Sequence, residues 1–209
     1  LQTRPSAGDP SPADESIAGE YFGLSSHETA LITAAAAAAA RQTALWGLDA
    51  TQTSVGVEEF LAHSKLDYPG LLQLMQVQWV NGDGGEPALE IVRTSTSGDL
   101  SLQTVDNLTV DRFDRLHRFL RLWRRAGWHM WELDLLLRAE RLGNGTLDGT
   151  ALARLHDAKR LQNALRIGAD ELLAFFGELN TETRTQPDDS TKTIDPHYVA
   201  LFQNPRITD

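Results

Sequence analysis

The sequence LTVDRFDRLHRFLRLWRRAGWHMWELDLLL, residues 108–137, decides how this chain folds. Its apolar residues recur at intervals of three and four, which predicts one face of an α-helix. That stripe consists of Phe113, Leu116, Phe119, Leu120 and Trp123. The arginines are expected to lie away from it, at positions Arg115, Arg118, Arg121 and Arg125. Gly127 and the cations before it predict that this helix ends near Ala126, because glycine and positive charge both suit a helix C-terminus.

A second helix is predicted directly after this turn. Residues 132–137 are so rich in leucine that we expect the helix to be buried on more than one side. Asp134 lies near its middle and is the one acid expected to be partly buried. The simpler interpretation of Asp134 is a salt bridge to an arginine such as Arg121 or Arg124, and the alternative is a catalytic carboxylate.

Composition limits the classes of protein to consider. The 209 residues are 41% hydrophobic and 23% charged, which is typical of a globular chain able to bury a core. A net charge of -10 argues against binding of nucleic acid or anionic lipid by the overall electrostatic field. The chain has no cysteine, which excludes disulfides and thiolate ligands. No apolar run approaches the roughly 18 to 20 residues that span a bilayer, so no membrane crossing is predicted.

The chain is predicted to form one all-α domain with a linker before it. Residues 1–16 are rich in Pro, Ser, Gly and Asp, which predicts a linker or disordered end, and residues 17–209 form the helical domain. A capping box at Ser25 to Glu28 predicts a helix start, since each side chain can bind the backbone N–H of the other. Asp67 is the predicted N-cap of a later helix, with Pro69 in its first turn. Because the chain starts at Leu1, we expect it to be a piece of a longer one.

Two stretches break the helical pattern. Within residues 77–107 a turn cluster and alternating apolar residues on both sides of Ser97 and Gly98 predict a small β-hairpin insertion. Residues 180–195 are polar and predict a loop.

Four turns share one pattern, in which an apolar residue precedes a capping or small residue and then a new helix. The apolar residues are Leu24, Leu66, Trp128 and Ile167, which are 42, 62 and 39 residues apart. A glutamate lies four residues further on in three of the four, at Glu28, Glu132 and Glu171. Leucines follow at matching places, namely Leu71, Leu133 and Leu172. The pattern indicates stacked helix-turn-helix units, similar to an α-solenoid, in which each unit packs against its neighbours.

No motif in the chain predicts a catalytic, cofactor-binding or metal-binding residue. The pair His27 and Glu28 lacks the second histidine that a zinc protease helix carries four residues on. The glycine-rich run that starts at Asn81 resembles part of a calcium loop, but Val92 stands where the twelfth-position glutamate is needed. His117 lies beside the apolar stripe without a partner motif, so a structural role is favoured over catalysis. We therefore expect a protein that is not an enzyme.

The arginine-rich helix allows two interpretations. A basic amphipathic helix with Trp and Phe is typical of helices that bind a membrane surface or a partner protein. The leucine-rich segments around it can instead cover its apolar stripe, which favours core packing with an ion-paired flank.

The block from Asp114 to Arg125, with Gly127-Trp128 and Glu132-Leu133-Asp134 after it, resembles a segment of the A component of bacterial Tc (toxin complex) insecticidal toxins. The flanks agree in order over roughly residues 17–208. They comprise Tyr21 to Ser25, Val57 to Leu61, Leu66 to Leu74, Val80-Asn81, and Tyr198 with Leu201 to Pro205. The sequence Arg-Phe-Leu-Arg-Leu-Trp, residues 118–123, is the most specific part of this resemblance.

The resemblance implies a segment of the α-helical shell that surrounds the translocation channel in such toxins. In that family the A component is a very large pentamer, secreted or held at the bacterial surface, whose shell opens on a pH change. An enzyme delivered by the B and C components then passes through the channel into the host cell. The partners implied are other parts of the same chain, four further copies and, indirectly, B and C. The alternative is a free-standing helical adaptor that binds a protein partner or membrane surface through its Arg/Trp-rich helix.

Overall fold

A computed structural model describes residues 13–33, 42–44, 46–49, 51–82, 87–94, 98–186 and 191–203. Helix predominates in these residues, as the sequence predicts, and the strands are short. The helices are α1 Asp14–Tyr21, α2 Ser26–Thr33, α4 Val57–Ser64, α5 Tyr68–Leu74, α6 Gln78–Asn81, α7 Val110–Ala126, α8 Met130–Arg138, α9 Gly149–Leu165, α10 Ala169–Phe175 and α11 His197–Phe202. The strands are β1 Val55–Gly56, β2 Glu90–Arg93, β3 Gln103–Asp106, β4 Arg184–Thr185 and β5 Thr193–Ile194, with a 3₁₀ turn at Leu100–Leu102.

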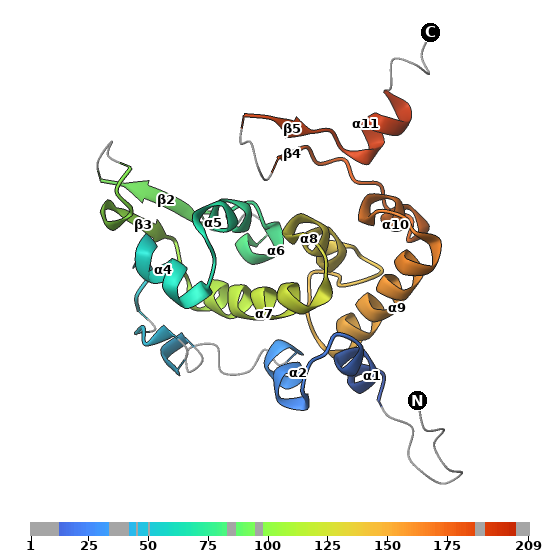
Figure 1. Cartoon of the computed structure of the whole chain (residues 1–209), viewed down its shortest axis with the longest axis horizontal. Helices are drawn as coiled ribbons and strands as arrows, with labels where there is room; N and C mark the ends of the chain where they lie inside the picture. Colours follow the sequence, from blue (N-terminus) through green and yellow to red (C-terminus); the bar gives the residue numbers. More distant parts are fainter. Residues whose placement is uncertain are drawn as a thin grey trace.

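Helix α7 is the central element of the fold. It begins at the N-cap Thr109, whose side chain accepts a hydrogen bond from the backbone of Arg112, and it ends at Gly127. Gly127 has a φ of 65°, a left-handed conformation that glycine adopts without steric cost. Figure 1 shows α7 across the middle of the molecule, with α5, α6 and α8 along one side and α2 on the other.

The predicted apolar stripe of α7 is buried, with one exception. Phe113, Leu116, Phe119 and Leu120 are buried, whereas Trp123 is only partly buried at the edge of the core. Leu122 lies outside the predicted stripe, beyond the edge formed by Phe119, and it is also fully buried. Helix α7 is therefore covered over a wider arc than its spacing predicts.

Arg118 lies off the apolar stripe, as the spacing predicts, but burial also extends to this side of α7. Its side chain is buried, and it donates hydrogen bonds to the backbone carbonyls of Ile32 and Leu147 while pairing with Asp114 at 3.3 Å. The guanidinium thus links the backbone of α2 to the segment before α9 inside the core, where buried carbonyl groups need hydrogen-bond donors.

Three of the four predicted turns share a backbone-to-glutamate contact, and at the fourth the carboxylate of Asp67 accepts from the backbone N–H of Gly70. The backbone N–H of Ser25, His129 and Gly168 each donates to a glutamate carboxylate three residues on, at 2.8 to 3.0 Å. The apolar residue precedes the N-cap and the matching leucine is the fourth residue of the helix, which are the two positions of a hydrophobic staple. All three of these leucines, Leu71, Leu133 and Leu172, are fully buried. Helix-start chemistry alone thus accounts for the recurrence of the pattern.

The predicted hairpin is present, but it belongs to a larger sheet. Strands β2 and β3 are antiparallel with Ile91 opposite Val105, and β1 adds a third strand on the other edge of β3, with Val55 opposite Val105. Strand β1 is not predictable from the sequence, because two residues are too few to show a period-two pattern. The proposed insertion also starts too early, since residues 78–81 form α6. Ser97 of the predicted turn, and residues 83–86 of the glycine-rich run, lie outside the described residues.

Two predicted boundaries also require correction. Residues 14–16 belong to α1 rather than to a linker, and Glu15 accepts a hydrogen bond from Thr33 Oγ1 at 2.7 Å. The predicted loop at 180–195 contains the antiparallel pair of β4 and β5, with Arg184 opposite Ile194. Both elements are too short for periodicity to reveal them.

The buried apolar residues form one cluster that runs from Ala18 in α1 to Leu173 in α10. Helix α1 packs on α9, and Tyr21 contacts His156 of that helix edge to face. The turn after α7 also packs on α9, because Trp128 donates to Gln162 at 2.8 Å and Lys159 lies 4.5 Å from the Trp128 ring centre. Among the described helices, none has both the length and the apolar character that crossing a bilayer demands.

Candidate functional site

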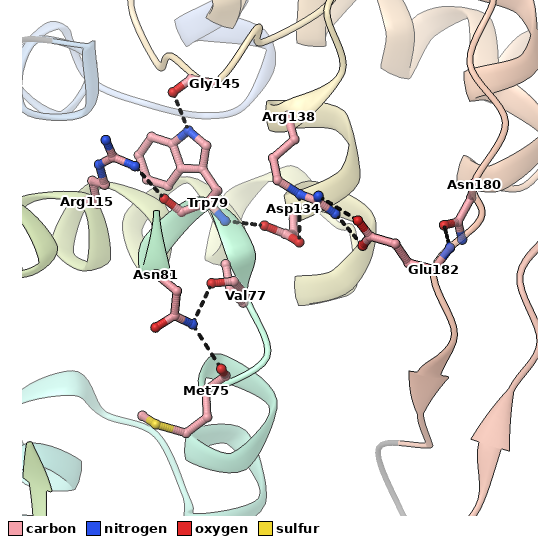
Figure 2. A network of polar contacts seen from close by, with 10 residues as sticks. All are labelled: Met75, Val77, Trp79, Asn81, Arg115, Asp134, Arg138, Gly145, Asn180 and Glu182. Atoms are coloured by element: carbon pink, nitrogen blue, oxygen red, sulfur yellow. Dashed lines mark hydrogen bonds and ion pairs between the residues drawn. The ribbon is translucent and has the colours of Figure 1, made fainter. Parts of the chain in front are cut away.

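Asp134 forms the centre of a buried polar network between α6, α8 and the segment before β4 (Figure 2). It is the fifth residue of α8, and its neighbours Leu133, Leu136 and Leu137 fill the core. The backbone N–H of Trp79 in α6 donates to Asp134 Oδ1 at 2.7 Å. The carboxylate therefore satisfies a donor at the start of a four-residue helix that has no side-chain cap of its own.

Arg138 is the cation that pairs with Asp134. It lies one helical turn further along α8, with its Nε 3.3 Å from Asp134 Oδ2. Its two terminal nitrogens bind the carboxylate of Glu182 at 2.8 and 2.6 Å, so one guanidinium joins two acids. The expected pairing with Arg121 or Arg124 is wrong, because those side chains bind His117 Nε2 and the carbonyl of Ser64 instead. Arg138 is four residues after Asp134 on the same helix, so it lies closer to the carboxylate than the arginines of α7 do.

Burial decides the electrostatics of the network. Desolvation raises the pKa of Asp134, and the attraction of Arg138 and hydrogen bonds from the backbone of Trp79 and Gln78 offset it only in part. Desolvation acts to lower the pKa of Arg138, but its bonds to Glu182 and Asp134 outweigh this and raise it. The hydrogen bond from Arg138 lowers the pKa of Glu182. Arg138 is thus a firmly charged link between an acid in the core and an acid near the surface.

Trp79 is a further residue of the same network, and no sequence pattern predicted its role. Its indole Nε1 donates to the carbonyl of Gly145 at 3.0 Å, and its own carbonyl accepts from Arg115 at 3.1 Å. The guanidinium carbons of Arg115 and Arg118 each lie 5.9 Å from the centre of its ring, a cation–π distance. One tryptophan therefore connects α6, α7 and the turn after α8.

A cavity of about 330 Å³ borders the network, between the residues before α6 and the strand β4. Its polar walls include Gln73, Gln76, Asp134, Asn180 and Arg184. Arg184 Cζ lies 3.4 Å from the centre of the Trp131 ring, and its two terminal nitrogens are each 3.4 Å from Asp170 Oδ2. The Arg138–Glu182 ion pair and the stacking of Arg184 on Trp131 hold residues 180–185 against α8, and the Arg184–Asp170 pair ties the same segment to α10.

A second concave surface lies along α7 on the side of α4. Its wall contains His63, His117, Arg121, Arg124 and Arg125, and it measures about 470 Å³. Arg125 pairs with Glu28 of α2 at 3.5 Å. We call this surface the arginine cleft.

The other candidates from the sequence stay apart. Glu28 binds the backbone and hydroxyl of Ser25 and the side chain of Arg125, so its carboxylate is used in helix capping. Asn81 donates to two backbone carbonyls and accepts from Leu89, whereas Val92 lies in β2. His117 accepts a hydrogen bond from Arg121. In the ranges that the structure describes, no group of three His, Asp or Glu side chains could hold a metal ion.

The residues missed by sequence analysis are Trp79, Arg138 and Glu182. Arg138 had one available signal, since it is four residues from an acid in a leucine-rich helix. Glu182 gave none, because it comes from a polar stretch 44 residues further along the chain. No protein-family model matches this chain, and neither a curated protein nor a solved structure matches it.

Proposed function

We propose that this chain is a non-enzymatic segment of the α-helical shell of a Tc toxin A component, secreted or displayed at the bacterial surface. In this proposal its helices stack as consecutive pairs, with α7–α8 between α5–α6 and α9–α10. Contacts of α6 with α7 and α8, and of α10 with α8 and α9, support that order, whereas the contact of α1 with α9 joins helices that are not neighbours in it. Its partners are other parts of the same chain, further copies in a pentamer and, indirectly, the B and C components.

The observation that carries the proposal is the burial of the segment on which the resemblance rests. Residues 110–138 form a helix-turn-helix in which Phe119, Leu133 and Leu136 are wholly inaccessible. A shell segment needs such a core, whereas a helix that binds a membrane through its apolar face needs that face exposed.

The exposed apolar residues support a place within a larger assembly. Phe175 is 64% exposed and Phe202 57% exposed, and Tyr198 and Leu201 extend the same kind of surface along α11. Figure 1 shows α11 beyond α10, away from α7. Large side chains of this kind usually pack against protein when they cluster, and neighbouring parts of the toxin chain are the proposed cover.

The test is to sequence the complete reading frame that encodes this chain and then to image its protein product by electron microscopy. We expect a chain of several thousand residues that assembles into fivefold particles with these helices in the outer wall. A reading frame that ends close to this segment, or a product that stays monomeric with no shell, overturns the proposal.

The adaptor alternative is tested separately by co-sedimentation with liposomes. Because Arg118 is buried, charge reversal there disturbs folding, and the informative variant is Arg121→Glu with Arg124→Glu. Salt-sensitive binding that this variant abolishes favours the adaptor. A wild-type protein that stays in the supernatant favours the shell segment.

A further inference from the structure

The arginine cleft concentrates positive charge in a chain whose net charge is -10. Arg121, Arg124 and Arg125 come from the last turns of α7, and His63 at the end of α4 faces them across the cleft. The ring of Trp46 stacks on His63 with centroids 5.3 Å apart, which fixes that wall. A volume of about 470 Å³ lies within the roughly 300–1,000 Å³ of small-molecule sites.

One acid, Glu28, belongs to the wall of the cleft and a second, Glu59, lies beside it, and each already has a partner. Glu28 binds Arg125 at 3.5 Å, and Glu59 lies 4.0 Å from His63. Arg121 and Arg124, by contrast, meet no carboxylate within ion-pair distance in the part of the chain that the structure describes. Arg121 Nε donates to His117 Nε2 at 2.7 Å, and Arg124 Nη2 donates to the carbonyl of Ser64. Each of these bonds uses one nitrogen of a guanidinium, and within the described residues neither guanidinium makes a second hydrogen bond.

The charged form of Arg124 is disfavoured where it lies in the cleft. Desolvation, followed by repulsion from Arg121, lowers the pKa of Arg124. Two cations held close together without an anion are unfavourable, and an anion between them relieves the repulsion. The bonds to His117 and to Ser64 hold the side chains in place, so little conformational entropy is lost when a ligand binds.

We propose that the arginine cleft is a binding site for a phosphate group, carried by a small soluble compound or present as inorganic phosphate. A planar guanidinium matches a phosphate with two parallel hydrogen bonds, and the several oxygens of phosphate can accept from Arg121 and Arg124 together. A membrane phospholipid is the less favourable source, because the apolar stripe of α7 beside the cleft is buried. This site does not depend on the toxin-shell assignment.

The test is isothermal titration calorimetry of the whole chain with inorganic phosphate and with pyrophosphate. We expect saturable binding of at least one of them with a Kd near or below about 1 mM. The variant Arg121→Gln/Arg124→Gln is expected to bind at least about tenfold more weakly, because each lost charge-assisted hydrogen bond has that effect. The matched control is Arg160→Gln, which removes one charge from an exposed position on α9 outside the cleft and is expected to bind like the wild type.

Two further measurements make the result decisive. Circular dichroism checks that the variants fold, and Arg121→Gln alone replaces the double variant if that one does not. Sedimentation with vesicles containing phosphatidic acid identifies the source of the phosphate. Binding of the soluble ions alone supports the proposal, whereas vesicle binding that the cleft variant loses, without binding of either ion, indicates a lipid headgroup and overturns it. No saturable binding of either ion or of vesicles, or equal affinity in the cleft variant and the wild type, overturns the proposal.

Discussion

Replacement of Asp134 by alanine and by asparagine separates its two roles in the buried network. Alanine removes the acceptor for the Trp79 N–H and one of the two carboxylates that bind Arg138. A buried donor without an acceptor costs about 1–3 kcal/mol. Loss of a fully buried ion pair costs about 3–5 kcal/mol, but the side chain of Arg138 is 26% exposed and keeps Glu182, so the charge contributes less here. We expect Asp134→Ala to lower the free energy of unfolding by about 2–4 kcal/mol.

Asparagine has nearly the same shape and can still accept from the Trp79 N–H. Because desolvation raises the pKa of Asp134 in the fold, the ionised carboxylate is less favourable there than in the unfolded chain. Asp134→Asn removes that penalty, so we expect it to stay within about 1 kcal/mol of the wild type at pH 7.

The pH dependence follows from the same raised pKa. The folded state binds more protons than the unfolded state between the ordinary aspartate pKa of 3.8 and the raised pKa. The stabilisation by protonated Asp134 is therefore fully present below 3.8 and is lost as pH rises through the raised value. Relative to Asp134→Asn, the wild type should gain stability as pH falls.

Urea unfolding followed by tryptophan fluorescence, at a series of pH values, measures all three proteins. The difference between wild type and Asp134→Asn cancels the other acids that both proteins share. A difference that is flat with pH, or an asparagine variant as unstable as the alanine variant at pH 7, would refute the assignment of desolvation as the dominant effect.

Three further predictions concern the core and its turns, each measured by the free energy of unfolding in urea. Replacement of Trp79 by phenylalanine leaves the carbonyl of Gly145 without its donor and should cost about 1–3 kcal/mol; no loss would mean that water replaces the indole. Gly127→Ala should cost about 1–2 kcal/mol from the positive φ alone, since the added carbon meets only Lys159 Nζ at 3.8 Å. Phe119→Ala should cost about 3–5 kcal/mol and Trp123→Ala clearly less, because only Phe119 is fully buried; equal losses would contradict this difference in burial.

Local chemistry explains why the helix boundaries were predictable. The end of α7 at Gly127, the capping box at Ser25 and the N-cap at Asp67 all depend on residues within four positions of each other. The same local rule produced a repeat-like pattern at four turns, since the staple and capping box recur wherever such a helix starts. Similar sequences at several helix starts therefore indicate similar capping, and they do not by themselves indicate that the helices stack as repeats.

Long-range contacts explain what was missed. Strand β1 is recognisable only from its pairing with β3, about 50 residues away, because two residues carry no period. The burial of Arg118 depends on carbonyl groups of Ile32 and Leu147, which lie 86 and 29 residues away. A hydrophobicity pattern counts arginine as a surface residue and takes no account of these acceptors.

By itself, the sequence determined that the chain is mainly helical, that α7 and α8 are joined at Gly127 and that Asp134 is buried. These features follow from apolar periodicity, capping and composition, which act over one or two helical turns. Only the tertiary structure decided that Asp134 pairs with Arg138 and accepts from Trp79, and that Arg121 and Arg124 share a cleft. The reason is that partners for buried polar groups are chosen by three-dimensional proximity, and the chain brings together residues that no local pattern relates.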